Sequence, residues 1–224
     1  MAAGRTVPRV LLATTIAITC SSFLPCTQAQ QCHTAHDPQA LKALQQRAAA
    51  GDADSQCGLG KQYEFALGVP EDEKQAAFWL QKSAEQGNIV AQVELGVVFD
   101  KIQDYAQALI WYRRAAERWH ARAEYNLALA YQNGEAVPKD LEQAIDWYRK
   151  AADQGDVLAL MNLGAMYENG VGVSADYLKA ADLYRKAAEE GFAEGEYGLG
   201  FLYLTGKGMP NDEVQAATWM RKAA

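Results

Sequence analysis

The chain has 224 residues, of which 50% are hydrophobic and 22% are charged. This apolar content excludes a wholly disordered chain, and the 18 Gly, 6 Pro and 4 Cys exclude collagen-like and disulfide-dense classes. Acidic residues outnumber basic ones by 28 to 21, which gives a net charge of −7. Neither nucleic acid nor an anionic membrane surface is therefore expected as a partner, because both need clustered positive charge on the protein.

The N-terminal residues 1–29 are typical of a secretory signal. Arg5 and Arg9 precede an apolar run, residues 10–18, and small residues then lead to Ala29. The run has about half of the ~20 apolar residues that span a bilayer, so we expect cleavage after Ala29 rather than a membrane anchor. The sequence thus predicts a mature chain without a membrane span, exported to the periplasm or secreted.

The rest of the chain repeats one unit. A leucine recurs at intervals of 36, 32, 36 and 36 residues, with a small residue four positions before it and an aromatic ring four positions after it. Side chains at i, i+4 and i+8 share one face of an α-helix, so each copy predicts an amphipathic helix, which we name helix A. The leucines are Leu59, Leu95, Leu127, Leu163 and Leu199, and each is followed by Gly or Ala.

A second stripe follows each helix A and predicts a second helix, helix B. An alanine is followed four positions later by a bulky residue and three positions further on by a small one. Four of the five Trp directly precede the bulky position of this stripe, and their recurrence at one repeat position indicates a packing role. Pro and Gly clusters between the stripes indicate loops, and a Gly after most B stripes indicates the end of the helix. Residues 38–50 match the end of a helix B and predict a lone N-terminal capping helix.

These motifs resemble the Sel-one-like repeat, a relative of the tetratricopeptide repeat with a longer loop. The fourth copy carries them at Ala159, Leu163, Gly164, Tyr167, Gly170, Gly172, Ala180, Tyr184, Ala187 and Gly191. The resemblance covers residues 53–224, after a tail and capping helix at 30–52. The five repeats are expected at residues 53–88, 89–120, 121–156, 157–192 and 193–224. The second repeat is shorter and carries Trp119 where others close with Gly.

The resemblance implies an all-α fold, a right-handed α/α superhelix of antiparallel helix pairs. It also implies a non-enzymatic scaffold that binds a protein or peptide on its concave side, which helix A lines. Two alternatives stay open. Because cysteine-rich exported relatives are linked to β-lactam binding, one is a β-lactam-binding protein or β-lactamase-like hydrolase. The other is an envelope assembly scaffold that contacts glycan polymers.

The sequence offers no catalytic constellation. It contains no S-x-x-K motif and no Cys pair in each repeat, and its 3 His lie outside the core stripes. Cys32, His33 and His36 are too few for a structural zinc site. We therefore expect no catalytic residue, no metal and no other cofactor. Export favours oxidised cysteines, so a disulfide is expected between Cys32 and Cys57, the two cysteines of the mature chain.

Helix A is also apolar on the side away from its leucine. Positions two before, two after and five before each leucine lie on that side, where a solvated face is normally polar. Two interpretations stay open: an apolar groove that binds a partner segment, or burial against neighbouring A helices. The candidate partner-binding residues are Val93, Val97, Tyr125, Leu129, Leu158, Met161, Tyr197 and Phe201.

A local basic cluster surrounds Trp119 in this acidic chain. Its members are Arg113, Arg114, Arg118, His120 and Arg122. The favoured interpretation is that arginine stems cover Trp119 at an irregular turn. The alternative is a contact for an anionic group of a partner or glycan.

Overall fold

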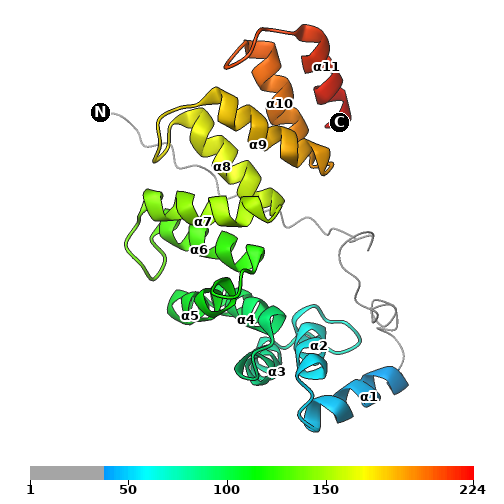
Figure 1. Cartoon of the computed structure of the whole chain (residues 1–224). Coiled ribbons are helices and arrows are strands. Elements are labelled where there is room, and N and C mark those ends of the chain that lie inside the picture. The colour runs from blue at the N-terminus through cyan, green and yellow to red at the C-terminus, as the bar shows by residue number, and fades with distance from the viewer. Residues whose placement is uncertain (1–37) are drawn as a thin grey trace. The chain divides into compact units, whose positions relative to one another are not determined.

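The computed structural model describes residues 38–224, which form eleven α-helices and no strand (Figure 1). The helices are α1 (Pro38–Ala49), α2 (Ala53–Glu64), α3 (Glu73–Glu85), α4 (Ile89–Lys101), α5 (Tyr105–Ala116), α6 (Ala121–Asn133), α7 (Leu141–Asp153), α8 (Val157–Asn169), α9 (Tyr177–Glu189), α10 (Ala193–Thr205) and α11 (Glu213–Lys222). The predicted all-α fold is confirmed, and the predicted N-terminal helix is α1.

The helices alternate between two rows. Helix A of the successive repeats is α2, α4, α6, α8 and α10, and helix B is α3, α5, α7, α9 and α11. Each helix packs against the one before and the one after it, and α1 packs against α2. The described residues are therefore a solenoid of helix pairs stacked in chain order (Figure 1).

The leucines of helix A and the alanines of helix B form the core between the rows. Leu59, Leu95, Leu127 and Leu199 are at most 1% exposed, and Leu163 is 3% exposed. The first alanine of each B stripe is at most 1% exposed as well. Burying a leucine side chain contributes roughly 2 kcal/mol, so these repeated positions supply much of the stability of the stack.

The glycine after the leucine lets helix B approach helix A. A Cβ atom added to Gly164 would lie 2.6 Å from Cε1 of Tyr184, which is closer than side chains pack. The third repeat has Ala128 at this position beside the buried Tyr148, so its packing already accommodates a methyl group. The small residue thus sets the separation of the two helices in each repeat.

The tyrosines of helix B end in hydrogen bonds to helix A. Tyr112 donates its hydroxyl to Asp100 at 2.7 Å, and Tyr184 donates to Glu168 at 2.8 Å. Burial raises the pKa of both tyrosines, so they remain protonated donors. The first repeat has Leu80 instead, and its buried Glu64 pairs with Lys101 of the next helix A at 2.8 Å.

Most helices begin with a capping side chain. Asp or Asn accepts a backbone N–H at the starts of α2 to α5, α7 to α9 and α11. Such caps stabilise a helix by about 1 kcal/mol. His120 and Phe192 begin α6 and α10 without a side-chain cap, so two A helices lack this contribution.

A buried carboxylate replaces an amide in the third repeat. Gln56 and Gln92 occupy one position of helix A and donate to the carbonyl oxygens of Ala48 and Ala84, at 3.0 and 3.2 Å. Glu124 takes this position in α6, is 1% exposed and accepts from Gln154. Burial raises the pKa of Glu124, although Lys150 and the Gln154 hydrogen bond oppose that effect.

We expect Glu124→Gln to raise the free energy of unfolding at pH 7 by about 1 kcal/mol, because the amide restores a donor and removes a buried charge. A raised folded-state pKa means that the folded chain holds the proton more tightly than the unfolded chain. The free energy of unfolding of the parent therefore falls as pH rises from about 4.3, the pKa of an unfolded Glu, through the raised pKa of the folded state. Below this pH range Glu124 is protonated in both states, so the variant should be no more stable than the parent there. Urea unfolding between pH 4 and 7 measures this, with the exposed Glu142→Gln as control. If Glu124→Gln raised the free energy of unfolding equally at every pH, the buried charge of Glu124 would not be the cause of the gain.

Candidate functional site

The candidate surface on helix A is partly core and partly exposed. Val93 is 5% exposed and packs in the core of the second repeat, so the interpretation of burial holds for it. Tyr197 is 57% exposed and lies at the other extreme. The remaining candidates, Val97, Tyr125, Leu129, Leu158, Met161 and Phe201, are half-buried.

Tyr125 on α6 contacts side chains of both α7 and α8. Its ring lies 5.9 Å from that of Tyr148 on α7, and its hydroxyl accepts a hydrogen bond from Asn162 of α8 at 3.4 Å. The guanidinium of Arg122 lies 5.4 Å from the ring centroid. Burial raises the pKa of Tyr125, as expected for a ring packed against the core. Tyr125 therefore supports the packing of the repeats as well as lining the A side.

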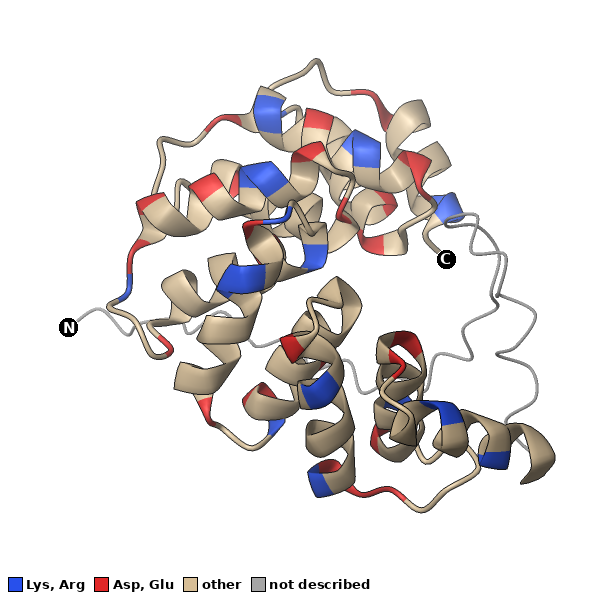
Figure 2. Ribbon diagram, turned by 60° about the horizontal axis from the view of Figure 1, so that its bottom comes forward, with Lys and Arg blue, Asp and Glu red and all other residues tan. Residues whose placement is uncertain are grey.

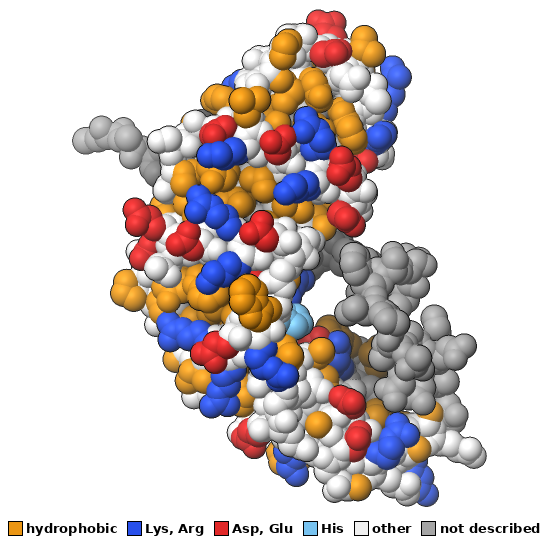
Figure 3. Space-filling model, viewed as in Figure 1, with side chains coloured by type: hydrophobic (Ala, Val, Ile, Leu, Met, Phe, Trp, Pro, Cys, Tyr) orange, Lys and Arg blue, Asp and Glu red, His pale blue; other side chains and the backbone are white. Residues whose placement is uncertain are grey.

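The most exposed part of this surface lies on α10. Tyr197, Phe201 and Leu204 stand at i, i+4 and i+7, which places them on one helix face, here named the α10 face. Tyr197 and Leu204 are exposed and Phe201 is half-buried, with the ammonium of Lys207 5.8 Å from its ring centroid. Hydrophobic side chains also reach the surface between charged ones in the view of Figure 3. The α10 face thus offers aromatic and aliphatic side chains beside one cation.

Ion pairs border the A row nearer the N-terminus. Lys61 lies 2.7 Å from Glu94, and Arg122 lies 4.0 Å from Asp156. Charges of both signs are spread over the helices and loops rather than gathered on one of them (Figure 2). The A row therefore carries ion pairs from α2 to the start of α8, and its largest exposed aromatic side chain, Tyr197, lies on α10.

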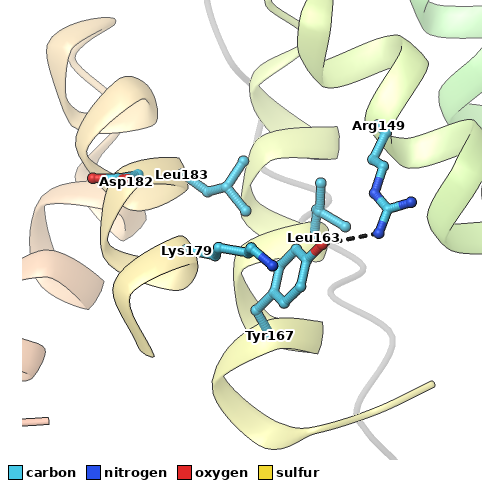
Figure 4. A pocket seen from close by; sticks show the side chains of 6 residues that line it. All are labelled: Arg149, Leu163, Tyr167, Lys179, Asp182 and Leu183. Carbon is cyan, nitrogen blue, oxygen red and sulfur yellow. Dashed lines mark hydrogen bonds between the residues drawn. The ribbon is translucent and has the colours of Figure 1, made fainter. Parts of the chain in front are cut away.

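A shallow pocket of about 230 Å³ lies between α7, α8 and α9 (Figure 4). In it Arg149 donates to the hydroxyl of Tyr167 at 3.0 Å and also pairs with Asp146 at 3.2 Å. Lys179, whose ammonium lies 5.1 Å from the Tyr167 ring centroid, pairs with Asp176. Since both cations already face carboxylates, the pocket carries little free charge for an anionic ligand.

The Arg149 contact is a repeated structural feature. Arg113 donates to the hydroxyl of Tyr131 at 3.3 Å, the same helix B to next helix A contact one repeat earlier. The sequence carries a signal for this contact, an arginine on helix B followed 18 residues later by a tyrosine on the next helix A. The pair links consecutive repeats, so the pocket is better explained by stability than by ligand binding.

The basic cluster does not cover Trp119, so the favoured interpretation of that cluster is wrong. Arg114 lies over the ring of Trp111, 4.5 Å from its centroid, and Arg118 donates to the carbonyl oxygen of Gly87 at 2.5 Å. Arg122 lies over Tyr125 instead. The side chain of Trp119 is 76% exposed.

Several sequence predictions fall outside the described residues. The signal segment, Cys32, His33 and His36 all precede residue 38. Cys57 is buried, and burial raises the pKa of its thiol to about 11, but the Cys32–Cys57 disulfide stays a prediction. Within residues 38–224 no group of His, Cys, Asp or Glu is arranged to hold a metal ion. No helix of that part is long and apolar enough to cross a membrane.

The stacked helix pairs define an α-solenoid repeat protein, and a family model identifies the repeat. The model of the Sel1 repeat matches residues 53–88, 89–118, 121–156, 157–192 and 193–224. The chain belongs to the Sel1 repeat family, as the sequence motifs indicated. The second match ends at residue 118, directly before Trp119. None of the curated proteins matches the chain.

Solved structures show the same fold. The chain is 40% identical to c5321, a protective antigen present in uropathogenic Escherichia coli strains, with a TM-score of 0.77 over 84% of this chain and 41% of that chain. A Sel1 repeat protein from Oxalobacter formigenes is 29% identical, with a TM-score of 0.78 over 88% and 81% of the two chains. A sel1 repeat protein from Klebsiella pneumoniae is 26% identical, with a TM-score of 0.54 over 82% and 91%. The chain thus spans less than half the length of c5321.

Proposed function

We propose that this chain is an exported scaffold that binds a protein or peptide segment on the helix-A side of the solenoid, with the α10 face as the main contact. The observation that carries the proposal is Tyr197, a large aromatic side chain that is 57% exposed on a helix whose opposite side is core. Exposed apolar patches on soluble proteins mark interaction sites, and tyrosines often supply much of the binding energy.

The other candidate residues contribute to the proposed contact to different extents, according to their exposure. Phe201 and Leu204 complete the α10 face, and the half-buried Leu158 and Met161 on α8 extend the apolar surface along helix A. Val93 belongs to the core and takes no direct part. The proposal is supported by the family, whose members typically serve as scaffolds for protein interactions.

Export is part of the proposal and rests on the sequence of residues 1–29. Such a signal places the mature chain in the periplasm or outside the cell. The mass and N-terminal sequence of the protein recovered from the source cells test it. A mature chain that begins at Gln30 supports export, and a chain that retains Arg5 and Arg9 contradicts it.

We expect Tyr197→Ala to weaken partner capture by tenfold or more, with little change in the thermal melt, because the ring is exposed in the free protein. Leu178 of α9 is the matched control, since it is a large apolar residue of the other helix row with 61% exposure. Purified variants are incubated with extract of the source envelope, and captured proteins are quantified by mass spectrometry. Equal losses for Tyr197→Ala and Leu178→Ala would place the partner elsewhere.

A further inference from the structure

The turn between α5 and α6 differs from the other turns that lead from helix B into helix A. Gly51, Gly87, Gly155 and Gly191 occupy one position of these turns with φ between 76° and 99°. Trp119 takes that position with φ 62°. This left-handed conformation is cheap for glycine and unfavourable for a side chain with a Cβ atom, so the fold prefers glycine here.

His120, the residue after Trp119, also lacks a stabilising contact that its counterparts in three other turns make. Asp52, Asn88 and Asp156 follow the glycines of three turns and cap the next helix through their side chains. His120 stands at this position of α6 and makes no side-chain cap, and Phe192 before α10 makes none either. Among the turns that lead into helix A, only the one at Trp119 and His120 combines a missing cap with a side chain at positive φ. A non-glycine residue held at positive φ is backbone strain, which is typical of a site kept for function.

Packing does not explain the Trp119 side chain. A Cβ atom built on Gly51, Gly155 or Gly191 meets no other atom within 4 Å, so this position of the turn faces open space. Trp119 itself is 76% exposed. The indole therefore projects into solvent from a short turn whose two ends are fixed by α5 and α6.

Two arginines flank Trp119 in sequence. Arg118 and Arg122 are both exposed and no acidic residue lies between them, although the exposed Glu117 directly precedes Arg118. Arg118 donates to the Gly87 carbonyl oxygen, and Arg122 lies over the Tyr125 ring, 4.0 Å from Asp156. That separation is longer than a hydrogen bond, unlike the 3.2 Å pairs of Arg149 and Lys179, so both guanidiniums are positioned and keep N–H donors for a ligand. Through Tyr125 the turn adjoins the candidate surface on helix A.

We propose that Trp119, Arg118 and Arg122 dock an acidic segment of a partner protein, with an apolar side chain against the indole and carboxylates on the two guanidiniums. The proposal rests on the proposed function and adds the chemistry of the partner. Arginine can pair a carboxylate with two parallel hydrogen bonds, and both Trp and Arg are enriched among the residues that dominate binding energy at interfaces. A glycan fits less well, because its hydroxyls call for acceptors as well as donors and the side chains of this turn supply mainly donors.

A pair of labelled peptides tests the proposal. One peptide of about 15 residues contains Glu and Leu, and its partner has Gln in place of every Glu. By fluorescence anisotropy at low salt, we expect the Glu peptide to bind at least tenfold more tightly than the Gln peptide. Trp119→Gly should weaken Glu-peptide binding by tenfold or more while its melting temperature stays equal or rises, and Arg118→Gln with Arg122→Gln should remove most of the salt dependence.

The double variant Trp119→Gly with Gly191→Trp is the matched control. It moves the indole to the equivalent turn before α10, which lies between Glu190 and Phe192, has no flanking arginine and leaves room for a side chain. We expect it not to restore binding.

Four results would overturn the proposal: no binding of the Glu peptide, equal binding of both peptides, unchanged binding by Trp119→Gly, or a clear fall in the melting temperature of that variant. Binding of polygalacturonate that depends on Trp119, without peptide binding, would assign the turn to an acidic glycan instead. If Trp119→Gly binds no less but Tyr197→Ala still loses partner capture, only the Trp119 proposal fails and the α10 face keeps its role.

Discussion

We expect Leu127→Ala to lower the free energy of unfolding by roughly 3–5 kcal/mol, because the deletion leaves a cavity in close-packed surroundings. Leu127 is 0% exposed and lies in the core of the second and third repeats among Ala108, Tyr112 and Ala123. Neighbouring repeats share their interfaces in a solenoid, so a cavity here weakens the helix pairs on both sides. Urea unfolding followed by circular dichroism measures the loss.

Leu129→Ala is the matched control for this prediction. It removes the same atoms two residues along α6, on the side away from the core stripe, where Leu129 is half-buried. We expect a loss of about 1 kcal/mol, because water already reaches part of that side chain. If the two variants lost equal stability, the assignment of the core stripe would be wrong.

We expect Gly164→Ala to lower the free energy of unfolding by about 1–3 kcal/mol, although alanine is the better helix former. The new methyl group would lie 2.6 Å from Cε1 and 2.9 Å from Cδ1 of Tyr184. Relief requires the ring to move, and that movement stretches the hydrogen bond from its hydroxyl to Glu168. Thermal and urea unfolding of the purified variant measure the effect.

Ala128→Gly probes the same position in the reverse direction. The third repeat already seats a methyl group beside Tyr148, so removing it leaves a small gap and a glycine within a helix. We expect a loss of about 1 kcal/mol from helix propensity and packing together. A gain in stability from either variant would contradict the proposed spacing of the two rows.

The repeat period made most of the fold predictable from the sequence. Because small, leucine and aromatic residues recur in register, the helices fall where the stripes lie, from α2 to α11. The match of residues 38–50 to the end of a helix B predicted α1, which ends at Ala49. Local periodicity fixes these elements, since each helix needs only its own stripe and its neighbours.

The candidate surface was less predictable, because exposure depends on how neighbouring repeats pack. Val93 and Tyr197 occupy the same position relative to the leucine of helix A, yet one is core and the other is 57% exposed. Periodicity places both on one side of the helix but does not say what covers that side. The position of the Trp119 indole escaped prediction for the same reason, since the nearby arginines bind a carbonyl oxygen, Asp156 and two other rings.

Site-specific photo-crosslinking in the source cells tests the proposed binding side most directly. A photoreactive phenylalanine analogue replaces Tyr197 on α10 in one variant and Leu178 on α9 in another, both of which are exposed. We predict a discrete protein adduct from position 197 and none from position 178. An adduct from position 178 with none from position 197 would contradict binding on the helix-A side.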